Sequence, residues 1–174
     1  MKQHLLFPTK VYTDNVILDI PLLIDFLYNT KQADKGVQLS NKGGWQSKST
    51  LNLHEEFHPL INYIQNTFQT YFKLKANKFN MWGNISSKYH YNAIHKHGSS
   101  PDILSGVYYL QTSKDSGCLT LHNNCDTDIN QSFLFKKGDL IYFTSSLPHS
   151  VDANLSDQDR ISIAFNFQIS DING

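Results

Sequence analysis

The sequence predicts a mainly β protein of the α+β class, in which N-terminal helices pack on one face of a jelly roll. Helical spacing of apolar residues occurs only in the N-terminal half of the chain. The C-terminal half reads as short strands separated by turn residues, which is typical of a sandwich or barrel. The 174 residues, 40% of them hydrophobic, suit one core. We expect a single domain over residues 1–174, with a helical portion to about residue 77 and a jelly-roll core over about 78–170.

Two helices are expected. The first covers Pro21–Asn29, with Asp19 as a possible N-cap and Pro21 near the first turn. The second runs from about Glu55 to Phe72, because apolar residues recur there at helical spacing. Between them, the Gly- and Ser-rich stretch SNKGGWQSKST (Ser40–Thr50) predicts an irregular loop around Trp45.

The expected strands are rich in Tyr, Ile, Val and Phe. Turn residues at Asp115–Gly117 and Lys137–Gly138 separate some of them. The strands are Lys78–Asn92, Leu104–Thr112, Cys118–His122, Ser132–Phe135, Asp139–Thr144 and Arg160–Ile169.

Charge and composition narrow the classes of partner. The 15 basic and 15 acidic residues cancel, so nothing in the net charge favours nucleic acid or an acidic membrane. No stretch approaches the roughly 18 apolar residues of a membrane span, and the N-terminus MKQHLLFPTK lacks the features of a signal peptide. Cys118 and Cys125 form no thiol metal motif, and without an export signal a disulfide is disfavoured. We therefore expect a cytoplasmic protein.

Of eight histidines, His95 and His97 form the most suggestive pair. His4 lies near a terminus, and His54 and His58 border the second helix, where solvated capping positions are the simpler interpretation. Residues two apart on an extended segment point to the same face, so His95 and His97 could reach one metal. The spacing alone fits equally well a polar edge with two solvated histidines.

The surroundings of His149 favour a metal site. A turn (KKGD) leads into an apolar strand, then Pro148–His149, a polar loop and a strand that begins at Arg160. In a jelly roll, this order can bring His149 opposite the His95–His97 segment. Arg160 would lie deeper, either as a solvated edge residue or as a receptor for a carboxylate. Its strand would present Ser162, Ala164 and Asn166 on the same face, and Ile161, Ile163, Phe165 and Phe167 to the core.

Four blocks together resemble a known family. SNKGGWQS, HKHGSSPDILSGVYYL, KKGDLIYFTSSLPHSVDAN and RISIAFNF occur in this order between about Phe7 and Phe167. They resemble a small family of 2-oxoglutarate- and iron(II)-dependent oxygenases common in marine bacteria and their bacteriophages. The resemblance implies a cupin-like double-stranded β-helix. It also implies a dioxygenase that couples hydroxylation of a substrate to conversion of 2-oxoglutarate and O₂ into succinate and CO₂, with ascorbate as a possible reductant.

The resemblance also implies roles for particular residues. His95 and His149 match the two histidines of the metal triad, and His97 sits where most relatives carry Asp or Glu. Arg160 matches the residue that pairs with the far carboxylate of 2-oxoglutarate, with a hydrogen bond from a hydroxyl such as Ser162 or Tyr109.

The sequence offers two candidates for the third metal ligand and several for the residues that face the substrate. The ligand is His97 unless Asp102 swings in from the GSSPD loop, and three histidines would also suit zinc. Asn84, Trp82, Tyr91 and Asn166 are candidates for the substrate side, together with Trp45; core anchoring is the simpler interpretation of both tryptophans.

Two alternatives to the oxygenase fit the same residues. One is a non-catalytic cupin-like module that binds a metal or a ligand, and the other is a cupin-type isomerase or dioxygenase that uses no 2-oxoglutarate. The substrate is not readable; a peptide, for example a prolyl residue, or a small molecule is expected rather than nucleic acid. A homodimer is compatible with the sequence.

Overall fold

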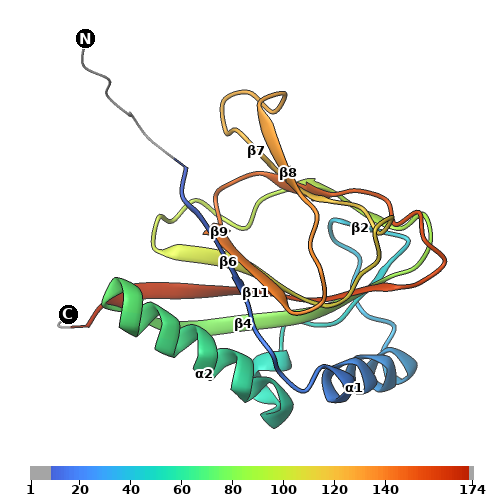
Figure 1. Cartoon of the computed structure of the whole chain (residues 1–174), viewed down its shortest axis with the longest axis horizontal. Coiled ribbons are helices and arrows are strands. Elements are labelled where there is room, and N and C mark those ends of the chain that lie inside the picture. Colours follow the sequence, from blue (N-terminus) through green and yellow to red (C-terminus); the bar gives the residue numbers. More distant parts are fainter. Residues whose placement is uncertain (1–8, 173–174) are drawn as a thin grey trace.

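Two antiparallel sheets face each other in the computed structural model, which describes residues 9–172 (Figure 1). One sheet has six strands in the order β1-β9-β6-β11-β4-β3, and the other has five in the order β2-β5-β10-β7-β8. This is the double-stranded β-helix that was expected. His4 and the start of the family resemblance near Phe7 lie outside the described residues.

The helices are α1 (Ile20–Ala33) and α2 (His58–Thr67). Short helical turns accompany them: η1 (Leu51–Leu53), η2 (Glu55–Phe57) and η3 (Phe68–Phe72). The strands are β1 (Val11–Asn15), β2 (Asn41–Lys42), β3 (Trp45–Gln46), β4 (Leu74–Ser86), β5 (Tyr91–His95), β6 (Ile103–Gln111), β7 (Leu119–His122), β8 (Asn130–Phe133), β9 (Asp139–Thr144), β10 (His149–Val151) and β11 (Arg160–Asp171).

The first helix begins as predicted and ends later. Asp19 caps it by accepting a hydrogen bond from the backbone N–H of Leu22 at 3.2 Å, and Pro21 lies in the first turn. The helix continues to Ala33, four residues beyond the predicted end.

The second predicted helix is divided into three pieces. A 3₁₀ turn precedes α2, and the π-helical turn η3 follows it. The chain leaves η3 through Lys73, whose φ of 58° is left-handed and ends the helical path.

Both helices cover the outer face of the six-stranded sheet, beneath β4 and β11 in Figure 1. Buried residues of the helices, such as Leu27 and Ile64, join one core with outward-facing residues of the sheet, such as Met81 and Phe165. At Gly83 the sheet and the helix approach so closely that a Cβ atom would overlap the side chain of Leu27.

A second, smaller core lies between the two sheets. It consists of Tyr109, Leu119, Leu121, Phe135, Ile141, Phe143 and Leu147. Of these, Tyr109, Leu119 and Phe143 also line the pocket described below, so this core borders it. No described helix is both long and apolar enough to cross a membrane.

The prediction of one continuous strand over Lys78–Asn92 is wrong, because a turn divides this segment between β4 and β5. The backbone N–H of Ser87 donates to Nδ1 of His90, and Tyr89 between them adopts a left-handed φ of 67°. The turn carries the chain from β4 in the six-stranded sheet to β5 in the five-stranded sheet.

The N-terminal portion, predicted as helical to about residue 77, also contributes strands to both sheets. β1 pairs with β9, and the predicted loop Ser40–Thr50 contributes β2 to one sheet and β3 to the other. Both cysteines are free thiols.

Candidate metal centre

A pocket of about 610 Å³ opens between the two sheets. Alternate residues of β4, β6 and β11 face it, because side chains alternate across a strand. Among the described residues that line the pocket, Arg160 and Lys96 are charged and none is Asp or Glu. A pocket of this size whose lining carries positive and no negative side chains suits a small anionic ligand.

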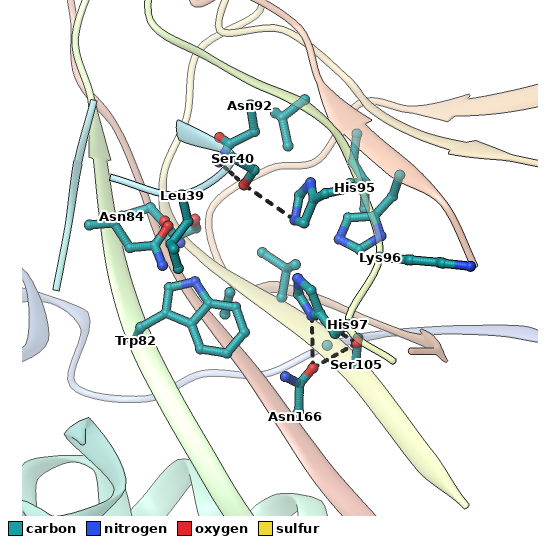
Figure 2. Close-up of a pocket in the computed structure, with 18 of the residues that line it drawn as sticks. Leu39, Ser40, Trp82, Asn84, Asn92, His95, Lys96, His97, Ser105 and Asn166 are labelled. Atoms are coloured by element: carbon teal, nitrogen blue, oxygen red, sulfur yellow. Dashed lines mark hydrogen bonds between the residues drawn. The ribbon is translucent and has the colours of Figure 1, made fainter. Parts of the chain in front are cut away.

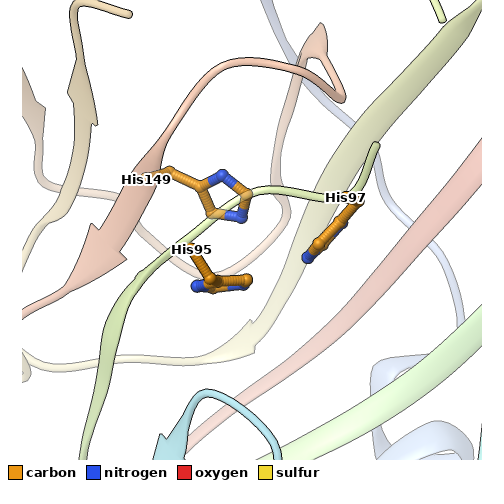
Figure 3. A group of neighbouring side chains, drawn as sticks. All are labelled: His95, His97 and His149. Carbon is orange, nitrogen blue, oxygen red and sulfur yellow. The ribbon is translucent and has the colours of Figure 1, made fainter. Parts of the chain in front are cut away.

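Three histidines converge in this pocket (Figure 3). One ring nitrogen from each of His95, His97 and His149 lies within 4.8 Å of the others. Pairing of β5 with β10 places His95 directly opposite His149, and their ring centroids are 4.2 Å apart. His97 approaches both rings from beyond the end of β5, with centroid separations of 4.9 Å.

Hydrogen bonds assign the tautomer of two of these rings. Nδ1 of His95 is 2.8 Å from the carbonyl oxygen of Ala93, and Nδ1 of His149 is 2.9 Å from that of Leu147. A carbonyl oxygen only accepts, so Nδ1 carries the proton and Nε2 keeps its lone pair for a metal.

Burial keeps the three rings neutral. It lowers the pKa of His95 and of His97, and it lowers the pKa of His149 to about 3, with a further contribution from the neighbouring His95. A metal binds neutral imidazole, so these histidines can act as ligands at neutral pH without first losing a proton.

Arg160 is buried in the same pocket with incomplete hydrogen bonding. Its Nη1 donates to the backbone carbonyls of Ser116 and, at 2.9 Å, of Asp152. Its Nη2 has no hydrogen-bond partner, and neither ion pair in the described part of the chain includes Arg160. A buried cation with an unused donor is costly unless a ligand completes it, so the geometry suits a carboxylate.

Polar side chains form a row across the sheet beside Arg160. Ser162 on β11 pairs with Tyr109 on β6 and with Asn84 on β4, and Asn84 pairs with Gln46 on β3. All four line the pocket, and Ser162, Tyr109 and Gln46 are buried. The row offers hydroxyl and amide groups next to the guanidinium.

The remaining candidate residues divide between the pocket and the rest of the molecule. Trp82 and Asn166 line the pocket, whereas Trp45 belongs to the core and donates from Nε1 to the carbonyl of Asp34. Tyr91 and Asp102 are exposed and lie outside both the pocket lining and the histidine cluster.

Residues that the sequence did not single out also reach the site (Figure 2). Ser40 Oγ lies 3.3 Å from Nε2 of His95, and Ser105 Oγ lies 3.3 Å from Nδ1 of His97. Gln46 lies in the block SNKGGWQS, and the family resemblance of that block could have identified it. Ser105 carries no signal of its own before the register of β6 and β11 is known.

The donor set fits a divalent transition metal. Three neutral imidazoles, two of them with Nε2 unprotonated, form a nitrogen site of the kind that Fe(II), Zn(II), Ni(II) and Cu(II) accept. The lone donor of Arg160 in the same pocket fits an acidic co-substrate.

Comparisons with known proteins agree with this geometry. The model of the 2OG-Fe(II) oxygenase superfamily matches residues 74–168, which is more than half of the chain. A comparison with curated protein sequences finds no match.

Solved structures share the fold at low sequence identity. A Pseudomonas putida prolyl-4-hydroxylase has a TM-score of 0.65 at 15% identity, covering 92% of both chains. A Trichoplax adhaerens prolyl hydroxylase, in complex with a hypoxia-inducible-factor peptide, has a TM-score of 0.68 at 13% identity, covering 91% of this chain and 83% of that one. HygX from Streptomyces hygroscopicus, with nickel and 2-oxoglutarate bound, has a TM-score of 0.65 at 11% identity, covering 92% and 83%.

Proposed function

Because the chain belongs to the 2OG-Fe(II) oxygenase superfamily, we propose that it is a hydroxylase that binds Fe(II) through His95, His97 and His149. Its co-substrates are 2-oxoglutarate and O₂, and its products are succinate, CO₂ and a hydroxylated substrate. The observation that carries the proposal is the convergence of three neutral imidazoles and one incompletely bonded, buried guanidinium in a single pocket.

When bound, the metal supplies the oxygen chemistry, and the chain supplies orientation. Arg160 binds the far carboxylate of 2-oxoglutarate through Nη2, while its Nη1 stays anchored to two backbone carbonyls. Since Nη1 is already fixed, little side-chain freedom is lost on binding. The hydroxyls of Ser162 and Tyr109 lie on neighbouring strands and add hydrogen bonds to the same carboxylate.

We propose a peptide as the primary substrate, with a prolyl residue as the first candidate. Exposed Leu39 and Ile94 lie at the lining of the pocket and offer apolar contacts to a chain that crosses it. Deeper, the amides of Gln46 and Asn84 can both donate and accept, as a peptide backbone requires. The similar structures include a prolyl-4-hydroxylase and a prolyl hydroxylase with a bound peptide.

The free thiols of Cys118 and Cys125 fit a cytoplasmic location.

The reaction is tested without knowing the substrate. Wild-type protein incubated with Fe(II), ascorbate and 2-oxoglutarate in air should form succinate slowly, and His149→Ala should form none above the background without protein. Succinate formation by His149→Ala at the wild-type rate would refute the metal centre. A wild-type protein that binds metal but never consumes 2-oxoglutarate would favour a non-catalytic cupin-like module.

The substrate class is tested separately. Proline-containing peptides should accelerate succinate formation and gain one oxygen atom by mass spectrometry, whereas matched peptides with alanine in place of proline should do neither. Equal stimulation by both sets would contradict a prolyl substrate, and no stimulation by any peptide would contradict the peptide class.

A further inference from the structure

We infer that Asn166 and Ser105 are positioning residues that hold His97 in one tautomer and one orientation, and so make it the third metal ligand. This inference rests on the metal centre proposed above. It also gives Asn166, which the sequence offered as a candidate for the substrate side, the role of holding a metal ligand in place.

His97 differs from the other two histidines in what its Nδ1 contacts. Nδ1 of His95 and of His149 meets a backbone carbonyl two residues earlier, which can only accept a hydrogen bond. Nδ1 of His97 instead lies 3.0 Å from Oδ1 of the Asn166 side chain (Figure 2). A carboxamide can present oxygen or nitrogen, so it selects a tautomer only if its own orientation is fixed.

Ser105 is the second hydrogen-bond partner of Oδ1. It is buried, and its hydroxyl donates to Oδ1 of Asn166 at 2.7 Å, the usual length of an O–H···O bond. Oδ1 has two lone pairs and therefore accepts from Ser105 and from Nδ1–H of His97 together. With the proton on Nδ1, the lone pair of His97 is on Nε2, the atom left for a metal.

The register of the sheet places this pair where the histidine needs it. Asn166 on β11 lies opposite Ser105 on β6, so both side chains point into the pocket side by side. The backbone N–H of His97 donates to the carbonyl of Ser145 at 2.8 Å. The ring of Trp82 stands edge-on to that of His97 with centroids 5.3 Å apart. The main chain, the ring and the Nδ1 atom of His97 each have a contact that restrains them, although His97 lies beyond the end of β5.

The pattern is that of a metal ligand supported through its second nitrogen. Such supporting hydrogen bonds fix the ring and raise its basicity, and their loss weakens metal binding about 10- to 100-fold. The same sheet offers a matched control: Asn80 pairs with Asn166 on the side away from Ser105, lines the same pocket, and is an asparagine.

The experiment measures the metal-free protein first. NMR spectra of the imidazole nitrogens should show His97 as the Nδ1–H tautomer in the wild type and as a mixture in Asn166→Ala. Titration with Ni(II) should then give an affinity about 10- to 100-fold lower for Asn166→Ala, a smaller loss for Ser105→Ala, and no loss for Asn80→Ala. Asn166→Asp keeps an acceptor at the same place and should retain at least the wild-type affinity.

Three results would overturn the inference: Asn166→Ala with the wild-type tautomer and affinity, Asn166→Asp as weak as Asn166→Ala, or Asn80→Ala as weak as Asn166→Ala. Thermal unfolding of each metal-free variant separates a loss of metal affinity from a loss of folding. A wild-type protein that binds no Ni(II) would refute the metal centre itself, and the NMR result would still report independently whether Asn166 sets the tautomer.

Discussion

Two cations line the pocket, and they differ in burial: the side chain of Arg160 is buried, and that of Lys96 is exposed. Removing a buried charged partner from a carboxylate costs about 2 kcal/mol or more, which is roughly 30-fold in affinity. Arg160→Ala should therefore weaken 2-oxoglutarate binding to the Ni(II)-loaded protein by about that factor or more while leaving Ni(II) affinity unchanged. Calorimetric titration under nitrogen measures both constants.

Lys96→Ala is the matched control for this prediction. It removes the same charge from the exposed side of the pocket, where solvent screening makes a single charge worth little. Equal losses in the two variants would mean that the general positive potential of the pocket, and not the Arg160 guanidinium, binds the co-substrate.

At the residue scale, sequence reasoning named most residues of the candidate site, Asn166 among them, and missed Ser105. Arg160, Ser162 and Asn166 share the pocket face because a strand alternates, and alternation is visible in the sequence. Ser105 is different, since its role depends on which strand lies beside β11 and in which register. Such a pairing between distant segments leaves no local pattern.

At the scale of elements, α1 shows how the helical layer supports the sheet that carries the site. Leu27 is fully buried against Gly83 of β4, whereas Leu22 on the same helix is 47% exposed. Leu27→Ala should lower the free energy of unfolding by about 2–5 kcal/mol through the lost burial and the cavity. Leu22→Ala should change it by less than about 0.5 kcal/mol.

Urea denaturation of the metal-free protein checks this pair of variants. Equal stabilities for Leu27→Ala and the wild type would contradict the packing of α1 on the sheet. Because α1 lies on the outer face, away from the pocket, Leu27→Ala protein that still folds should retain its Ni(II) affinity.

The elements themselves were predictable to different degrees. Helical spacing and the Asp19 cap located α1, whose actual start is one residue before the predicted one. Strands β2 and β3 have two residues each, too few for any alternation to show, and they form because long-range partners on β5 and β4 pair with them. The turn that separates β4 from β5 escaped prediction because Ser87–His90 contains neither Gly nor Pro.

At the scale of the whole molecule, the buried histidines should make the metal-free protein acid-sensitive. His149 has a pKa lowered to about 3 in the folded protein, mainly by burial, and an unfolded histidine titrates near its ordinary value of 6.5. Below pH 6.5 the unfolded chain therefore binds the extra proton, so stability is present above this value and is lost as pH falls toward 3. The loss approaches ~1.4 kcal/mol per pH unit from this histidine alone.

The lowered pKa values of His95 and His97 act in the same direction. Urea midpoints of the metal-free protein measured across this pH range test the effect. His149→Gln should show a flatter pH dependence than the wild type; an unchanged slope in this variant would show that His149 is not the main buried proton acceptor.

We propose that one pocket holds both a metal ion bound by three histidines and a 2-oxoglutarate molecule anchored on Arg160. The most direct measurement is a crystal structure of the anaerobic complex with Fe(II) and 2-oxoglutarate, with the iron located by its anomalous scattering. We expect iron bound to Nε2 of His95, His97 and His149, and the far carboxylate of 2-oxoglutarate on Nη2 of Arg160. Iron ligated by a carboxylate such as that of Asp102 in place of His97, or 2-oxoglutarate bound away from Arg160, would contradict the account.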